Sequence, residues 1–208
     1  MDVYNFIINT LRSALAMLFP VLVPSLGEAL SERSGVYNVG VEGYMLVGAL
    51  SGYYGMYFTD NLLLSLIAAI VTGALLGLVH AFLSISMKSD QIISGIGIWL
   101  FGVAFTAFLF RLLGINQPIN GFPVVHIKVL SNLPIIGPIL FQQNVLLYIG
   151  LLLVLTFHIL LYFTRFGLLV RATGDNPLAV DMAGHNVFLI RYVSVLISGA
   201  MSGLGGAY

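Results

Sequence analysis

Long runs of residues without an ionised side chain constrain this chain more than any other feature. Residues 61–87, 91–110 and 129–164 contain no Asp, Glu, Lys or Arg. A membrane-spanning helix needs about 20 apolar residues with few or no charges, and each run is long enough. Only 8% of the residues are charged and 59% are apolar, which excludes an ordinary soluble domain. Because no alternating pattern persists, the runs predict membrane helices rather than barrel strands.

The remaining apolar stretches complete the predicted fold. They are residues 13–27, 43–59 and 192–208. Pro134, Gly137 and Pro138 interrupt the run 129–164, so we expect its helix at 144–164. The prediction is an all-α polytopic bundle forming a single transmembrane domain over residues 1–208. It has about six or seven membrane segments, the number depending on half-helices within 13–30 or 34–43.

The positions of the basic residues predict the topology. Arg165, Arg171 and Arg191 gather in the loop 165–191, and short cytoplasmic loops collect Lys and Arg. Counting back from this loop places the polar patch at Glu28 to Arg33 and the turn at 87–89 inside, and residues 60–61 and 114–142 outside. Five spans then precede the loop, which puts the N-terminus outside, whereas a sixth span would reverse it.

Glycines recur four residues apart within the apolar runs. Such spacing gives a helix a smooth stripe against which another helix can pack closely. Three pairs predict a tightly packed bundle: Gly48 and Gly52, Gly73 and Gly77, and Gly199 and Gly203.

The segment 31–49 combines glycines with polar residues. If it is helical, Asn38 and Glu42 share one face, and an ionisable group at membrane depth indicates a functional site. Two interpretations remain open: a helix break that lines a translocation path, or a Glu42 that is solvated or paired with Arg33 at the boundary. With Asn38 and Glu42, Gln91 and Trp99 are the candidates for lining the path.

The loop 165–191 predicts a two-turn helix. Asp175 or Asn176 can cap it, Pro177 suits its first position, and Gly184 can end it after Ala183. An apolar face of two residues four apart, Leu178 and Met182, lies opposite Asp181. The helix is either an inert connector or a docking element for a cytosolic partner.

Motifs for enzyme chemistry are missing from the sequence. It has no Cys, no GxxxxGK[ST] phosphate loop, no HExxH pair and no GxSxG elbow, and its four histidines are scattered. We therefore predict no catalytic residues, no metal site and no cofactor, and we interpret each histidine as a packing or surface residue. Equal numbers of acidic and basic residues give no field for nucleic acid. A conduit is favoured, and a membrane enzyme is the weakest alternative.

Four sequence stretches carry a specific resemblance. They are SERSGVYNVGVEGYMLVGA at 31–49, LPIIGPILFQQN at 133–144, TRFGLLVRATGDNPLAVDMAGHNV at 164–187 and SGAMSGLGGAY at 198–208. Together they resemble the permease subunits of ABC importers for nucleosides and simple sugars, within the wider group of ribose and branched-chain amino acid permeases. The Glu-Arg-Ser-Gly form is more similar to the nucleoside type.

This resemblance implies a multi-pass subunit in the plasma (inner) membrane of a prokaryote, surrounded by lipid. Its implied partners are a sister permease, a cytosolic ABC ATPase that hydrolyses the ATP, and an extracytoplasmic substrate-binding lipoprotein. The family's coupling helix, which fits a cleft on the ATPase, maps onto Asn176, Pro177, Ala179, Asp181, Ala183 and Gly184. Among these, the small residues Ala179, Ala183 and Gly184 allow close seating.

Three further expectations follow from the resemblance and the sequence. Family members continue beyond the Gly-Gly-Ala stretch, so we expect the chain to be C-terminally incomplete. The alternative function is a secondary transporter with discontinuous helices, unwound at Pro20, Pro24 and the glycines of 34–43. Few charges in the spans argue against a strongly ionic cargo.

Overall fold

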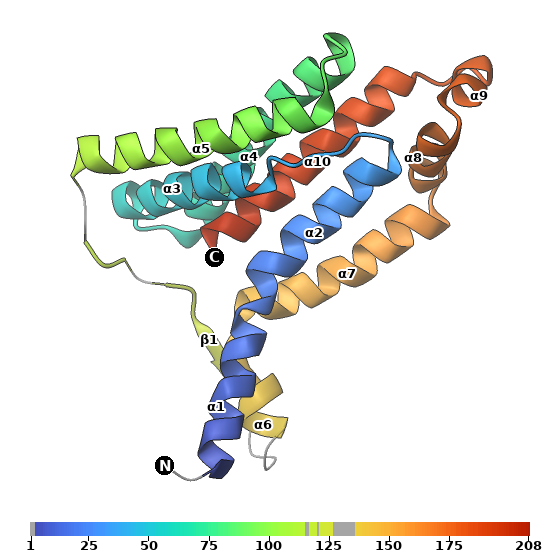
Figure 1. The fold of residues 1–208 in the computed structure, drawn as a ribbon. Coiled ribbons are helices and arrows are strands. Elements are labelled where there is room, and N and C mark those ends of the chain that lie inside the picture. Colours follow the sequence, from blue (N-terminus) through green and yellow to red (C-terminus); the bar gives the residue numbers. More distant parts are fainter. Residues whose placement is uncertain (1–2, 115–116, 120, 127–135) are drawn as a thin grey trace.

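Long helices make up most of the computed structural model, which describes residues 3–114, 117–119, 121–126 and 136–208 (Figure 1). The predicted all-α bundle is confirmed. In chain order the elements are α1 (Val3–Ala16), α2 (Leu18–Arg33), α3 (Val41–Thr59), α4 (Leu62–Ala81), the π-helix η1 (Phe82–Ser86), α5 (Gln91–Leu113), β1 (Val124–His126), α6 (Ile136–Leu140), β2 (Gln142–Asn144), α7 (Val145–Phe163), α8 (Arg165–Asp175), α9 (Pro177–Met182) and α10 (Val187–Ala207). The predicted outer connection includes residues 115–116, 120 and 127–135, among them Pro134, which lie outside the described residues.

Five of the described helical stretches are long and apolar enough to cross a membrane: Phe6–Arg33, Leu62–Ser86, Gln91–Leu113, Val145–Phe163 and Val187–Ala207. This number is slightly lower than the six or seven segments expected. α3 also has 19 residues, but four glycines and four tyrosines among them lower its hydropathy. It packs against α4, α5 and α10 and so belongs to the same bundle.

Local sequence determines where the helices begin. A side-chain oxygen accepts a backbone N–H of the first turn at the start of six helices, and the capping residues are Asn61, Asp90, Asn144, Thr164, Asn176 and Asn186. α1 and α2 meet at Met17, where Pro20 explains the break because its ring nitrogen cannot donate to the carbonyl of Ala16. The expected helix 144–164 is thus present as α7, capped by Asn144.

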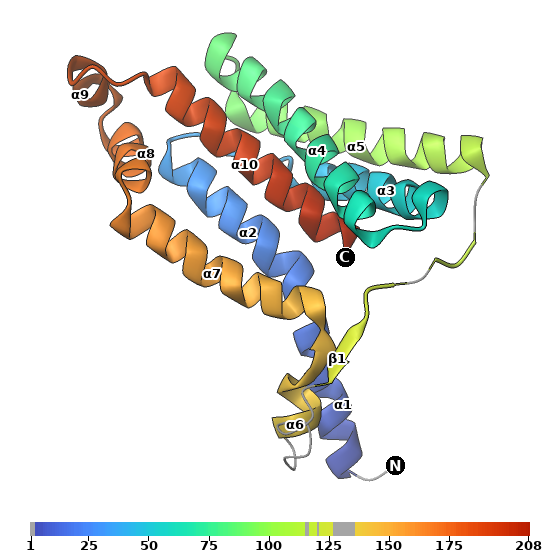
Figure 2. The same cartoon turned by 180° about the vertical axis from the view of Figure 1, so that it is seen from behind.

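The connections gather at two ends of the bundle (Figures 1 and 2). α9, the α4–α5 turn and the segment 34–40 lie at one end, here called the α9 end. The α3–α4 turn, the pair of β1 and β2, and the N-terminal helix lie toward the other, the strand end. Between these ends the chain runs through α2, α3, α4, α5 and α7 before it reaches α8.

α10 occupies the centre of the bundle, where it packs against α2, α3 and α4. A Cβ added to Gly48 of α3 would lie 2.6 Å from the Gly203 Cα, and one on Gly77 of α4 would lie 3.3 Å from the Gly199 Cα. Six glycines each face a neighbouring helix in this way: Gly48, Gly52, Gly73, Gly77, Gly199 and Gly203. At five of them the helix backbones touch without intervening side chains, whereas Gly52 faces the side chain of Ala207.

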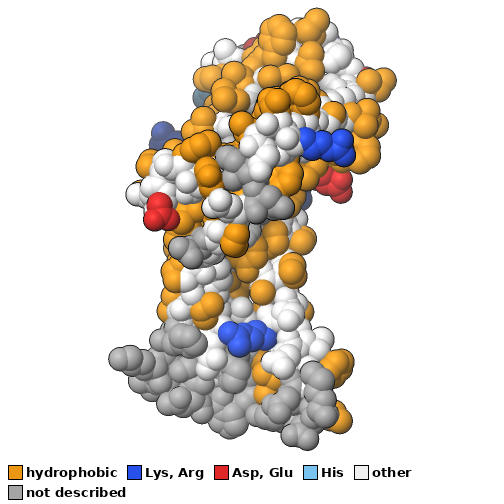
Figure 3. Space-filling view, turned by 90° about the vertical axis from the view of Figure 1, so that its left-hand side faces the viewer, with side chains coloured by type: hydrophobic (Ala, Val, Ile, Leu, Met, Phe, Trp, Pro, Cys, Tyr) orange, Lys and Arg blue, Asp and Glu red, His pale blue; other side chains and the backbone are white. Residues whose placement is uncertain are grey.

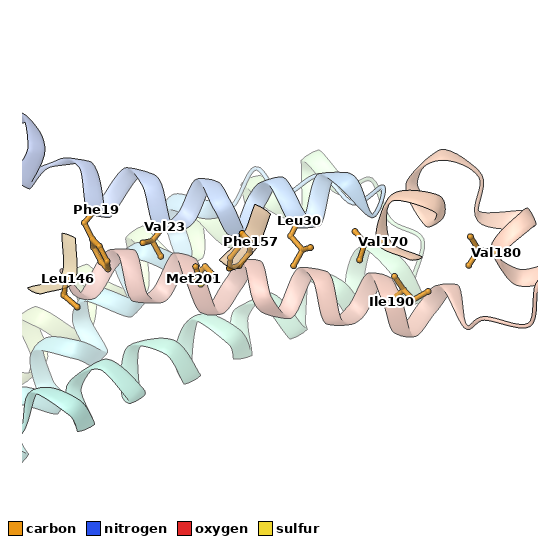
Figure 4. Close-up of a cluster of buried hydrophobic side chains, with 9 residues drawn as sticks. All are labelled: Phe19, Val23, Leu30, Leu146, Phe157, Val170, Val180, Ile190 and Met201. Carbon is orange, nitrogen blue, oxygen red and sulfur yellow. The ribbon is translucent and has the colours of Figure 1, made fainter. Parts of the chain in front are cut away.

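Larger side chains fill the other side of α10. A buried cluster joins α2, α7, α8, α9 and α10 (Figure 4): Phe19, Val23, Leu30, Leu146, Phe157, Val170, Val180, Ile190 and Met201. Apolar side chains also spread over the outer face shown in Figure 3, where charged groups are few. A surface this apolar is suited to lipid or to other membrane subunits.

Candidate functional site

α9 projects from the bundle between α8 and α10 (Figures 1 and 2). The Asn176 side chain accepts the backbone N–H of Ala179 over 3.1 Å, and Pro177 is the first helical residue. Gly184 follows the helix with φ +82°, in the left-handed region that favours glycine. The short helix is therefore where the sequence predicts it, and of the two candidate caps Asn176 is the one used.

The side chains of α9 divide into one anchor and an outer face. Val180 is 5% exposed and belongs to the cluster in Figure 4, whereas Leu178 and Met182 are 74% and 89% exposed. Among the predicted coupling residues Pro177 is half-buried, and the others are exposed: Asn176, Ala179, Asp181, Ala183 and Gly184. A helix fixed by one buried residue, with two large apolar side chains facing outward, is suited to packing against another molecule.

The elements on both sides of α9 touch the end of α2. A Cβ added to Gly174 of α8 would collide with the carbonyl oxygen of Arg33, and it would lie 3.4 Å from the Gly35 nitrogen. On α10, Nε of Arg191 donates to the carbonyl oxygen of Ser34 over 3.1 Å. The helix that projects outward is thus connected, through both of its neighbours, to the segment that follows α2.

The segment 34–40 joins α2 to α3 without being helical. Side chains of helices bind its backbone. Oε1 of Glu28 accepts the N–H of Asn38 over 2.8 Å. At Tyr37, the N–H donates to Oε1 of Gln91 over 2.8 Å, and the carbonyl oxygen lies 3.2 Å from Nε2 of His80. Non-helical backbone at membrane depth persists only where its polar groups are satisfied. With Arg191, residues of four helices (α2, α4, α5 and α10) hold this segment.

Two of the predicted path residues meet at this segment. Asn38 is 4% exposed, and its Oδ1 accepts the N–H of Gly40 over 3.0 Å. Its Nδ2 is buried with no hydrogen-bond partner in the described part of the chain. Gln91 binds the Tyr37 N–H, as noted, and its Nε2 lies 3.4 Å from the carbonyl oxygen of Gly35. Asn38 therefore holds a buried amide donor beside the Glu28 carboxylate and the Tyr44 hydroxyl.

The other two path candidates are exposed, unlike Asn38. Trp99 of α5 is 38% exposed, and its Cα would lie 2.8 Å from a Cβ added to Gly43. Glu42 is exposed in the first turn of α3. The helical face that Asn38 and Glu42 were expected to share does not form, because α3 begins only at Val41.

Sequence reasoning missed Glu28, His80 and Arg191 as residues that hold the segment 34–40. We expected Glu28 in a polar patch at the boundary, but its Oε2 accepts the hydroxyl of Ser198 on α10 over 3.0 Å. A signal for Glu28 was present, since an ionisable residue within an apolar helix indicates a specific partner. His80 and Arg191 gave no comparable signal, because their partners are backbone carbonyls distant in sequence.

Metal ligands do not gather in the part of the chain that the structure describes. Within residues 3–114, 117–119, 121–126 and 136–208, no three His, Asp or Glu side chains are close enough to hold an ion. The polar groups at the segment 34–40 instead form hydrogen bonds to backbone. Their chemistry is that of holding a non-helical backbone in place.

The fold and the site define a multi-pass membrane protein of the plasma (inner) membrane, with a small helix presented at one end of its bundle. Residues 10–208 match the family model described as the branched-chain amino acid transport system permease component. The chain belongs to this family of transporter permeases. No solved structure matches it.

Relatives in the same family carry more specific names. The chain is 38% identical to a provisionally named glucose ABC transporter permease protein of Haloferax volcanii, over 98% of this chain and 63% of that protein. It is 35% identical to a guanosine ABC transporter permease protein of Bacillus subtilis, over 99% and 68%. It is 34% identical to a nucleoside ABC transporter permease protein of Lactococcus lactis, over 97% and 68%. The chain thus spans about two thirds of the length of these relatives, and it is similar to ABC permeases for sugars and nucleosides.

Proposed function

We propose that this chain forms half of the translocation path of an ATP-driven importer, and that a separate cytosolic ABC ATPase docks on α9. The exposure of Leu178 and Met182 on a helix anchored by Val180 carries this proposal. A docking helix needs an outer apolar face to bury against its partner and an inner anchor that resists displacement. The sequence of this chain contains no phosphate loop, so ATP hydrolysis is assigned to the partner.

Charge distribution supports a cytoplasmic location for α9. Arg165 and Arg171 lie on α8 and Arg191 lies near the start of α10, so three basic residues flank the projecting helix. Short loops rich in Arg and Lys stay in the cytoplasm. The strand end then faces the extracytoplasmic side, where a substrate-binding lipoprotein delivers the cargo.

Close packing gives the bundle a way to respond to the ATPase. Where backbones touch at Gly48, Gly77 and Gly203, few side chains intervene that could change rotamer and absorb a shift. Movement of α9 therefore displaces helices as rigid bodies and alternates the side from which the path is open. A sister permease supplies the other half of the path.

An uncharged polar molecule is the proposed cargo, with nucleosides ahead of simple sugars. The buried Nδ2 of Asn38 can donate a hydrogen bond to a hydroxyl or to a base carbonyl. Few ionised groups lie in the spans, and a strongly ionic cargo would need counter-charges along its path. The names of the similar proteins include guanosine, nucleoside and glucose transport, which agrees with this chemical class.

The docking role of α9 can be tested with one substitution and a matched control. Gly184→Glu places a bulky charge directly after α9, and Gly114→Glu places it after α5 at the strand end. Both glycines have positive φ, +82° and +60°, and an added Cβ meets no atom within 4 Å at either. We expect Gly184→Glu to abolish uptake by the assembled importer while membrane insertion stays normal, and Gly114→Glu to retain uptake. Normal uptake with coupled ATP hydrolysis in Gly184→Glu would show that α9 does not couple.

A further inference from the structure

We propose that Arg191 and Gly174 form the link that carries the movement of α9 to the segment 34–40, an inference that rests on the proposed docking of α9 to an ATPase. Both are positioning residues: they touch the connection between α2 and α3, which in turn places Asn38. Within the rigid-body movement of the helices, the link gives the coupling helix a defined route to the buried path candidate.

Arg191 connects the start of α10 to the end of α2. Its Nε donates to the carbonyl oxygen of Ser34, the residue that caps the C-terminus of α2, over 3.1 Å. One of its terminal nitrogens lies 3.2 Å from the position of a Cβ on Gly35. A cation at a helix C-terminus is attracted by the exposed carbonyls, so the contact is held by charge as well as by the hydrogen bond. A shift of the start of α10 is thereby passed to Ser34 and Gly35.

Gly174 makes the second contact, from the end of α8. Because Gly174 has no side chain, the backbone of α8 packs directly against the backbone of Arg33. A Cβ added to Gly174 would collide with the carbonyl oxygen of Arg33. Backbone against backbone leaves no rotamer to absorb a displacement. The end of α2 is therefore contacted from both neighbours of α9, by Gly174 of α8 and by Arg191 of α10, and the two contacts meet at Gly35.

Hydrogen bonds hold the segment 34–40 closely enough for it to transmit a displacement of Ser34. Ser31 Oγ donates to the Val36 carbonyl oxygen over 2.7 Å, and Val36 itself is 1% exposed. The next residues, Tyr37 and Asn38, are bound through their N–H groups to side chains of α5 and α2. A displacement at Ser34 reaches Asn38 along a short stretch of chain in which nearly every residue is hydrogen-bonded.

The chain contains no Cys, so single cysteines report on chosen positions without a background from this subunit. Leu178→Cys reports on α9 and Tyr37→Cys on the segment 34–40, since these side chains are 74% and 58% exposed. The assembled importer is labelled with a water-soluble maleimide, with and without vanadate-trapped nucleotide. Nucleotide is expected to shift the balance between two conformations of the importer. We therefore expect the maleimide labelling rates of Leu178→Cys and of Tyr37→Cys each to change by about tenfold.

Arg191→Gln and Gly174→Ala each break one contact of the link. We expect both variants to keep the nucleotide response of Leu178→Cys and to lose that of Tyr37→Cys, with uptake falling by about tenfold as the response is lost. The controls are Arg165→Gln, an exposed arginine at the start of α8, and Gly97→Ala, where an added Cβ meets nothing within 4 Å. Both controls should retain both responses.

The labelling results distinguish failure of the link from failure of the docking of α9. A Tyr37→Cys response that survives in both Arg191→Gln and Gly174→Ala overturns the link and leaves the docking of α9 intact. A parent importer in which Leu178→Cys does not respond to nucleotide overturns the docking, and the link with it. If Arg191→Gln fails to assemble, Gly174→Ala decides alone, and Arg191→Lys, which keeps a cation beside the α2 carbonyls, is expected to restore part of the Tyr37→Cys response.

Discussion

Glu28 is a half-buried carboxylate in an apolar helix that binds two neighbouring elements at once. One oxygen accepts the N–H of Asn38 over 2.8 Å, and the other accepts the hydroxyl of Ser198 over 3.0 Å. Glu28→Leu leaves both donors unpaired, so we expect the free energy of unfolding to fall by about 1–3 kcal/mol. Glu28→Gln keeps an accepting oxygen and should lose less. Unfolding in detergent measures both, and equal stability of the two variants would contradict this role.

Gly203 is a residue at which the backbone of α10 lies directly against the backbone of α4. An added Cβ would collide with the carbonyl oxygen of Ala69 and would lie 3.0 Å from the Gly73 Cα. Gly203→Ala is therefore expected to lower the free energy of unfolding by about 1–3 kcal/mol, because rigid helix backbones must separate. Gly97→Ala, which has open space, should stay within about 0.5 kcal/mol of the parent. Thermal unfolding compares the two, and the idea fails if their midpoints shift equally.

At the scale of the element, α9 depends on its cap. Asn176→Ala removes the side chain that accepts the Ala179 N–H, which costs a helix about 0.5–2 kcal/mol. Because α9 has only six residues, and Pro177 has no N–H, we expect the amides of 178–182 to exchange hydrogen faster while those of α7 stay protected. In Asn176→Ser, which keeps an accepting oxygen, the amides of α9 should exchange hydrogen at the parent rate. Unchanged exchange in Asn176→Ala would mean that contacts other than the cap hold the helix.

An element could be predicted from the sequence when the residues that determine its structure lie within it or next to it in the chain. α7 and α9 were predicted closely, since Asn144, Asn176 and Gly184 act within a few residues of themselves and charge gaps mark the spans. The segment 34–40 was not, because its conformation depends on side chains of other helices. The pair of β1 and β2 was missed because three-residue strands are too short to show a pattern.

The candidate site divides in the same way. The exposed face of α9 could be predicted, because Leu178 and Met182 are four residues apart on one helix. The contact of Arg191 with Ser34 could not, because the two lie 157 positions apart and a single sequence does not show long-range pairs. Pairing Asn38 with Glu42 assumed a helix, and α3 starts one residue before Glu42.

For the whole molecule, the source of energy distinguishes the proposed importer from a secondary transporter. Family membership and the projecting α9 favour ATP, whereas the non-helical segment 34–40 is a feature that secondary transporters share. We expect uptake by cells carrying the assembled importer to stop when ATP is depleted at a maintained ion gradient. It should continue when an uncoupler removes the gradient and ATP is held constant. The opposite pattern would assign the chain to gradient-driven transport.

Cross-linking from α9 in native membranes tests the central claim most directly. A photoreactive residue is placed at Leu178, and a control is placed at Leu63, which is 66% exposed at the start of α4 on the opposite end of the bundle. We predict that Leu178 forms an adduct with a cytosolic ATPase subunit and that Leu63 does not. An adduct only with lipid or an extracytoplasmic protein, or equal reaction from both positions, would contradict the docking of the motor on α9.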